Sequence, residues 1–276
     1  MKFTILGMGI WGRGLQGAGA LGEVVRGASA IVPETEFVAP RPAAIPAREQ
    51  RRAGLLVNLA VMVAHEACEN AGVDKTLVPS VFASALGDTD VTDYMCRKLT
   101  QTEKLLSPTR FHNSVHNAAA GYWSISAANH APSTFVGGFV NSVGAGLLEA
   151  VTQARAFGQP TLLVCYDIAN RQPFADLLPV GESLACALVI GGEAGEQAAS
   201  QAGIDCELAY VDGQTSPTPP STPALAQLAS ANPVGQALSL CEAVVRVCGP
   251  GFAGERTLWI SATPSASLRI VLRKPS

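Results

Sequence analysis

The chain is poor in charge, and it lacks several patterns that would assign it to a common functional class. Only 15% of its residues are charged and 48% are hydrophobic, so we expect plentiful buried surface and some apolar surface that a partner covers. The densest basic cluster, Arg48, Arg51 and Arg52, is too small to support nucleic-acid binding. The longest apolar stretch, near residues 55–64, is too short to span a bilayer.

Cysteine and histidine are also distributed in ways that exclude some chemistry. The 7 cysteines form no CxxC pair, and their odd number argues against a disulfide framework. With no convincing signal peptide, this pattern favours a reducing, cytoplasmic setting. No cysteine lies between Cys96 and Cys165, and no histidine follows His130. These two gaps limit the nucleophiles and bases that any site can contain.

What the sequence does contain is an alternation of strand and helix signals up to residue 190, which indicates an α/β layered fold. We expect strands at 2–6, 80–86, 161–165 and 181–190, and helices at 48–70, 90–106 and 115–130, with 161–165 covered on both faces. We divide the chain into a domain at 1–192, a loop or linker at 193–223 rich in Gly, Pro, Ser and Thr, and a helix plus two strands at 224–276 that pack on the same domain.

Residues 135–167 predict a strand, a tight turn, a helix and a second strand. The helix has one apolar face from Gly144 onward, and Gly158 ends it. A turn from strand to helix is a common site for an exposed, activated Ser or Cys. This turn, residues 139–144, is called the elbow below. Instead of a cysteine, it carries Val140, Asn141 and Ser142.

Near the N-terminus, Gly7, Gly9 and Gly12 match GxGxxG after a predicted strand. A dinucleotide site would also need an acidic residue about 20 residues further on, at the end of a second strand. Glu34 lies in a Pro-rich loop instead, and Trp11 crowds the motif. We therefore expect no cofactor here, and we interpret the motif as a glycine turn packed against its neighbours.

Two further patterns allow alternatives. His112 and His116 are four residues apart, which suits a metal if both lie on a helix, but no Glu, Asp or Cys is close in sequence. We therefore expect no metal site, and we expect both imidazoles to be hydrogen-bonded near an interface.

Ser142 could be a hydrolase nucleophile, although the first Gly of GxSxG is missing and no orienting acid can be assigned. Asn141 could donate a hydrogen bond to a carbonyl, or simply be tolerated in a tight turn.

Four segments, in their order and spacing, resemble the N-terminal half of β-ketoacyl synthases, which have the thiolase fold. They are 5–10, the 51–72 helix with 81–87, Asn117 to Gly121 followed by Ser124 and Ile125, and 158–167 followed by 181–190. The resemblance covers about residues 1–192. It implies a thiolase-like α/β fold, mainly the N-terminal ketosynthase half, with a shortened and divergent C-terminal part.

In that family a Cys three residues before a Gly at the elbow carries the acyl group. Alignment on Gly144 and Gly158 places Asn141 at that position. The family's two catalytic histidines lie in its C-terminal half, where this chain has none. Condensation needs a thiolate and supporting imidazoles, and an Asn amide cannot form a thioester. The resemblance therefore implies no catalytic residues, hence a pseudoenzyme subunit of a 3-oxoacyl-[acyl carrier protein] synthase complex.

The string FHNSVHNAAAGYWSI, residues 111–125, resembles the chain-length-factor-like, half-length ketosynthase homologues of aryl polyene and type II polyketide pathways. Such proteins pair with an active ketosynthase and are thought to complete its acyl tunnel. The resemblance implies a heterodimer with an active ketosynthase, which acts on an acyl chain held by an acyl carrier protein. Candidate tunnel or interface residues are Phe111, His112, Val115, His116, Asn117, Gly121, Asn141 and Ser142.

Two other functions stay open. The chain could be a self-associating acyl-binding or scaffold protein that uses no ketosynthase partner. It could also be a hydrolase or malonyl decarboxylase that uses Ser142 or Asn141. Many chain-length factors carry Gln at the nucleophile position, and Asn141 departs from that pattern.

Overall fold

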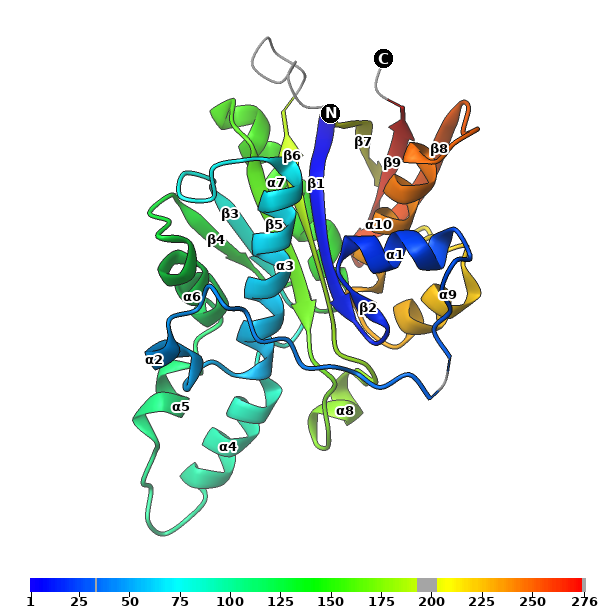
Figure 1. Cartoon of the computed structure of the whole chain (residues 1–276). Helices are drawn as coiled ribbons and strands as arrows, with labels where there is room; N and C mark the ends of the chain where they lie inside the picture. Colours follow the sequence, from blue (N-terminus) through cyan, green and yellow to red (C-terminus); the bar gives the residue numbers. More distant parts are fainter. Residues whose placement is uncertain (33, 193–202, 275–276) are drawn as a thin grey trace.

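A single mixed β-sheet runs through the molecule in the computed structural model, which describes residues 1–32, 34–192 and 203–274 (Figure 1). The strand order is β4-β3-β5-β6-β1-β7-β9-β8, with the short β2 paired to β1. Strands β4, β3 and β5 are parallel, and the remaining pairs are antiparallel. The strands are β1 (Lys2–Gly12), β2 (Leu15–Gln16), β3 (Ser80–Ala83), β4 (Ser133–Val136), β5 (Thr161–Asp167), β6 (Leu184–Gly191), β7 (Ile204–Asp212), β8 (Glu255–Thr263) and β9 (Ala266–Arg273).

Helices cover both faces of this sheet. One face packs against α3 and α6, and the other against α7 and α10 (Figure 1). The helices are α1 (Ala18–Val25), α2 (Ala47–Gln50), α3 (Leu55–Ala71), α4 (Thr89–Leu99), α5 (Pro108–His112), α6 (Ala118–Ala127), α7 (Ser142–Phe157), α8 (Phe174–Leu177), α9 (Pro223–Ser230) and α10 (Gly235–Cys248), and a 3-10 turn, η1, spans Phe139–Asn141.

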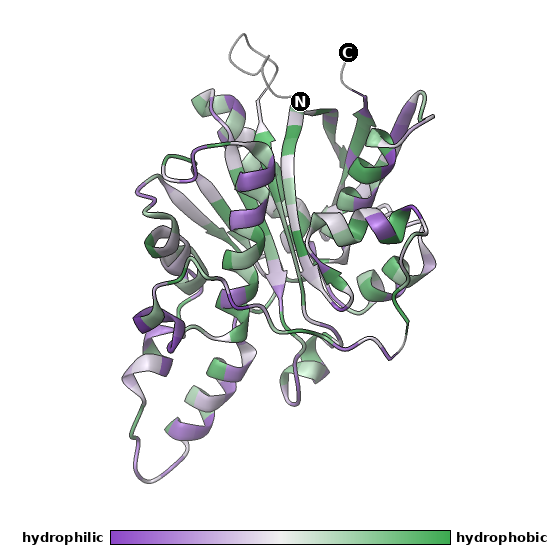
Figure 2. Ribbon diagram, in the orientation of Figure 1, coloured by the Kyte–Doolittle hydropathy of each residue, from purple (hydrophilic) through white to green (hydrophobic). Residues whose placement is uncertain are grey.

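The central strands divide their side chains between two hydrophobic clusters. In β6, Leu188 and Ile190 belong to the cluster with α7 and α10, whereas Ala187 and Val189 belong to the cluster with α3 and α6. All residues of β5 and β6 are buried, and the middle of the sheet is accordingly largely apolar (Figure 2). The expectation that 161–165 is covered on both faces is confirmed, as is the α/β layered fold.

The glycines of the GxGxxG motif have a packing role. Gly7, Gly9 and Gly12 lie within β1, so the expectation of a glycine turn is wrong. A Cβ at Gly9 would collide with the backbone of Val63, and one at Gly7 would lie 2.6 Å from the carbonyl oxygen of Ala67. Glycine therefore lets α3 lie directly on β1.

Several helices are shorter than the sequence suggested. Residues 48–70 form α2 and α3 with a break at 51–54, and α3 ends as expected at Gly72, which has φ of 62°. The helix expected at 115–130 is reduced to α6. Pro233 separates α9 from α10. No helix in the described ranges is long and apolar enough to cross a membrane.

The linker expected at 193–223 is wrong for residues 204–212, which form β7 and pair with β1. Its first part, 193–202, lies outside the described residues. The Pro-rich remainder runs along β8, where the Thr218 amide donates to the Trp259 carbonyl at 2.9 Å. The Trp259 amide donates to Thr218 Oγ1, also at 2.9 Å. The C-terminal part thus supplies strands to the sheet, and a proline-rich segment covers part of its β8 edge.

Candidate functional site

The elbow follows β4 and leads through η1 into α7. Phe139 has φ of 55°, a conformation that is unfavourable for a residue with a Cβ. The side chains of Phe139 and Val140 are exposed, while Asn141 and Ser142 are buried. Phe139 and Val140 therefore form the outward part of the elbow, and Phe139 is its strained residue. Asn141, at the position that the resemblance assigns to the nucleophile, is buried.

The Ser142 hydroxyl is held entirely by backbone groups. Its Oγ accepts from the Gly138 amide at 2.9 Å, and it lies 2.7 Å from the Phe139 carbonyl oxygen and 3.1 Å from that of Ser84. None of these partners can act as a general base. In this arrangement the hydroxyl stabilises the turn, and nothing prepares it for nucleophilic attack.

The amides of the elbow are engaged as well. The Asn141 amide donates to the Gly138 carbonyl at 2.9 Å, and the Ser142 amide donates to the Phe139 carbonyl. An oxyanion site needs free amides that point toward the reacting carbonyl. The 3-10 turn uses both of these amides internally.

The C-terminal part braces the elbow from behind. Gln236 of α10 donates from Nε2 to the Val140 carbonyl at 3.0 Å and accepts at Oε1 from the Ser261 amide of β8 at 2.8 Å. Gly144 lies so close to β8 that a Cβ there would collide with the Ser261 carbonyl oxygen. Neither the packing of Gly144 on β8 nor the role of Gln236 was predicted from the sequence, because no local pattern marks them.

A small apolar cavity opens beside the exposed half of the elbow. Its volume is about 330 Å³, and its lining includes Val140, Pro179, Pro217, Pro233 and Gln236. Ligand pockets commonly measure roughly 300–1,000 Å³, so this one suits a short apolar segment. The rigid proline rings set its shape.

A buried carboxylate fixes the loop on the other side of the elbow. Asp167 accepts from the Ser84 hydroxyl at 2.7 Å and from the Ala85 amide at 3.0 Å. Burial raises the pKa of Asp167 to about 6, and these hydrogen bonds offset part of that effect. The loop includes Gly87, whose φ is 66° and against which the His116 ring lies. Asp167 is not among the candidate residues that the sequence predicted.

The two histidines of the candidate set lie against aromatic rings. The His116 ring is 5.1 Å from that of Phe135 in β4, and the His112 ring meets Tyr122 edge-on at 6.4 Å. Within the described residues neither imidazole forms a hydrogen bond, which differs from the expectation. No group of three His, Cys, Asp or Glu side chains in this part of the chain is arranged to hold a metal.

The structure gathers only part of the candidate set. Asn141, Ser142 and His116 lie around the loop that contains Ser84 and Gly87. The other candidates lie on the outer surface along α5 and α6, where all of them are exposed: Phe111, His112, Val115, Asn117 and Gly121. None of the eight candidate residues lines the elbow cavity, although their neighbour Val140 does.

Comparison with solved structures gives the fold. The ketosynthase ApeO in complex with its chain length factor ApeC from Xenorhabdus doucetiae matches with a TM-score of 0.69 and 19% identity, over 98% of this chain and 99% of that one. The ishigamide ketosynthase/chain length factor matches with a TM-score of 0.69 and 14% identity, over 100% of both chains. A beta-ketoacyl synthase from Burkholderia phymatum matches with a TM-score of 0.67 and 12% identity, also over 100% of both chains. No curated protein sequence matches the chain.

These likenesses confirm the thiolase-like fold that the resemblance implied. The sequence itself matches the family described as "Beta-ketoacyl synthase, N-terminal domain" over residues 28–244. That range begins just after α1, ends within α10, and includes the elbow, its supporting loop and Gln236. The chain belongs to the beta-ketoacyl synthase N-terminal domain family.

Proposed function

We propose that the chain is a non-condensing ketosynthase-like subunit that pairs with an active ketosynthase. In this proposal it shapes the path of an acyl or polyene chain that an acyl carrier protein delivers. The partner supplies the thiolate and both histidines. The product class that fits is an aryl polyene or a type II polyketide, because residues 111–125 resemble that group.

One observation carries the proposal: the elbow presents Phe139 and Val140 outward, it contains no thiol, and the amides of Asn141 and Ser142 are hydrogen-bonded within the turn. The nearest cysteine along the chain, Cys165, is buried in β5, and burial raises the pKa of its thiol well above the usual range. An apolar, rigid elbow can form a wall for an acyl chain without forming a thioester to it.

The surface beside the elbow supports a partner. Strand β4 is at one end of the sheet, so one of its edges has no strand partner among the described residues. Next to it, α6 turns Gly121 and Ile125 outward; Ile125 is 51% exposed, and a Cβ at Gly121 would meet nothing within 4 Å. Small and apolar residues on an exposed helix let another chain approach closely.

A projecting arm extends this surface. Helices α4 and α5 and the loop between them lie apart from the sheet (Figure 1). On the arm, Leu105 is 72% exposed and Phe111 is 60% exposed, and Val115 follows on the same stretch. Large apolar side chains at such exposure are typical of surfaces that a partner covers. Two similar solved structures, named for a ketosynthase and its chain length factor, support a partner of this kind.

The test is co-expression with a ketosynthase encoded nearby. We expect a stable complex, which Ile125→Glu or Gly121→Lys disrupts because each places a charge on the exposed face of α6. The matched control is Tyr210→Glu on β7, where the side chain is similarly exposed at 50% but lies away from α6. Circular dichroism of each variant checks that the fold is retained.

A second measurement addresses catalysis. The chain alone, incubated with a labelled acyl-acyl carrier protein, should not retain the acyl group or condense malonyl units. Stable acylation of the isolated chain would contradict the proposal. Self-association without any ketosynthase complex would favour the acyl-binding or scaffold function instead.

A further inference from the structure

A second, larger groove lies at the other end of α10. It has a volume of about 700 Å³ and lies between α1 and the end of α10. Its apolar lining includes Met8, Val25, Val244, Val245 and Phe252. Apart from Val244, these side chains are only partly buried, so the groove has apolar walls that remain partly exposed.

Three guanidinium groups from three different elements line the same groove. Arg26 follows α1, Arg246 is in the last turn of α10, and Arg256 is in β8. Arg26 is exposed, and its guanidinium forms no hydrogen bond or ion pair with the residues that the structure describes. Its Nη1 lies 3.0 Å from where a Cβ at Gly22 would stand, so the guanidinium packs over Gly22 of α1.

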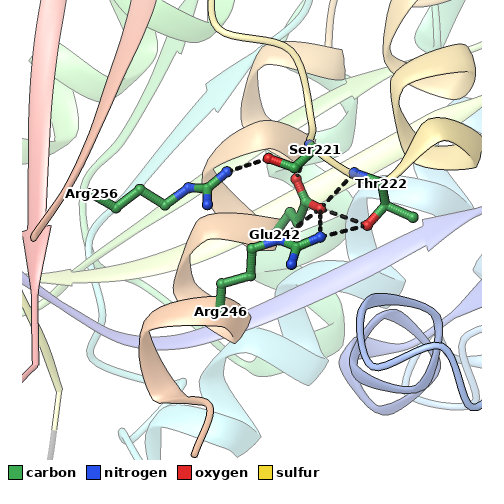
Figure 3. A network of polar contacts seen from close by, with 5 residues as sticks. All are labelled: Ser221, Thr222, Glu242, Arg246 and Arg256. Carbon is green, nitrogen blue, oxygen red and sulfur yellow. Dashed lines mark hydrogen bonds and ion pairs between the residues drawn. The ribbon is translucent and has the colours of Figure 1, made fainter. Parts of the chain in front are cut away.

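Figure 3 shows how the other two arginines are held. Arg246 pairs with the buried Glu242 at 2.8 Å, and the same carboxylate accepts from the Thr222 amide at 2.9 Å. Arg256 donates from Nη2 to Ser221 Oγ at 2.6 Å, while its buried Nε has no acceptor among the described residues. Glu242 neutralises Arg246, which leaves the charges of Arg26 and Arg256 uncompensated by this network.

The groove is distinct from the elbow cavity. Gln236, which contacts the elbow, and Arg246 are ten positions apart on α10. At a rise of about 1.5 Å per residue, that separation is roughly 15 Å along the helix axis. No residue lines both the groove and the elbow cavity. The elbow therefore does not explain this combination of apolar walls and fixed positive charge.

We propose that this groove binds an amphiphilic anion, namely an apolar chain that ends in a single carboxylate or phosphate. Arg26 and Arg256 hold the anionic head, since guanidinium groups make strong, often bidentate hydrogen bonds to carboxylates and phosphates. The chain lies along Val25, Val245 and Phe252. Arg246 and its carboxylate partner keep the Ser221 and Thr222 segment in place beneath the head. This site is independent of the proposed subunit function.

The chain carries its own reporter for this site. Cys248 lines the groove and is exposed, whereas Cys96 is exposed on α4, far from it. Decanoate and decyl phosphate should slow the alkylation of Cys248 by iodoacetamide at least fivefold and leave the rate at Cys96 unchanged. Peptide mass spectrometry over time measures both rates in one sample.

Three comparisons decide the proposal. Arg26→Gln or Arg256→Gln should raise the decanoate concentration needed for protection at least fivefold, whereas Arg269→Gln, an exposed arginine on β9, should not. Decanol and inorganic phosphate should each protect far less than decanoate. Equal protection by either compound, equal slowing at Cys96, or no effect of the Arg26 and Arg256 substitutions would overturn the proposal.

Discussion

At the scale of single residues, burial decides how His65 behaves. Its Nε2 lies 3.0 Å from Ser126 Oγ and its Nδ1 lies 3.3 Å from Lys75 Nζ, with Trp123 edge-on at 4.9 Å. Because an ammonium only donates, Nδ1 accepts and Nε2 carries the proton. Desolvation by burial, and secondly the charge of Lys75, lower the pKa of His65 to about 4.

This pKa predicts a loss of stability in mild acid. As pH falls, the unfolded chain binds a proton at His65 near pH 6.5, before the native state does. The contribution of the neutral His65 to the free energy of unfolding is therefore full above pH 6.5 and is lost as pH falls toward 4. The loss should be on the order of 2 kcal/mol. Urea unfolding at pH 7 and pH 4.5 measures it. The His65→Gln variant should lose this pH-dependent change in stability. The control variant His130→Gln, at an exposed histidine, should keep the change seen in wild type.

The comparison with wild type at each pH is needed because Asp167 acts in the opposite direction. Its raised pKa of about 6 means that the native state binds this proton first, so acidification from pH 6 toward 4 stabilises the fold. The difference between wild type and His65→Gln isolates the histidine. No change in that difference between the two pH values would contradict the assignment.

Two helical glycines, Gly144 in α7 and Gly121 in α6, should respond oppositely to alanine. Gly144→Ala places a Cβ against the Ser261 carbonyl and should destabilise the fold by about 1–3 kcal/mol, as overpacking does. Gly121→Ala extends into open space on α6 and should stabilise it by up to about 1 kcal/mol, because alanine favours helix. Thermal unfolding measures both changes, and equal effects would contradict this account of the packing.

At the scale of elements, sequence reasoning worked where a pattern is local. The buried run of β5 and the end of α3 at Gly72 follow from apolar residues and glycine alone. Sequence reasoning failed where contacts between distant segments determine the secondary structure. The GxGxxG glycines lie in β1 because α3 packs on them, and β7 forms because β1 and β9 provide partners on both sides. The position of Asn141 was predictable from spacing, but the outward turn of Phe139 and Val140 was not.

Gln236 tests whether α10 holds the elbow to β8. Gln236→Ala removes the bond to the Val140 carbonyl and leaves the Ser261 amide without its acceptor, which should destabilise the fold by about 1–3 kcal/mol. Amide exchange of residues 139–142 should quicken more than that of α3. The exposed Gln227→Ala on α9 is the control and should change neither quantity. Unchanged exchange in the elbow would show that other contacts hold it.

At the scale of the whole molecule, the same sheet holds the ketosynthase-like half and a C-terminal part that contributes strands, a brace for the elbow and a second groove. That C-terminal part contains no histidine. It therefore reproduces the support that the elbow needs without the imidazoles that condensation needs. This division lets the elbow keep its shape without histidines from the C-terminal part.

Restoring the cysteine should not restore the reaction. Asn141→Cys places a thiol at the aligned position, but Asn141 is buried, and the Asn141 amide already donates to the Gly138 carbonyl. A thiolate there would lack the imidazoles that the family has in its C-terminal half, and the amide of its own residue would not be free for the oxyanion. We expect the isolated variant to condense labelled malonyl units no faster than wild type, measured as labelled product on an acyl carrier protein.

Condensation by the variant alone would mean that this chain contains a complete active site after all, and that the elbow was inactivated by one residue. Condensation only when an active ketosynthase is present, at the same rate for wild type and variant, is the result that a wall-forming subunit predicts, because the partner's thiolate then does the chemistry in both cases.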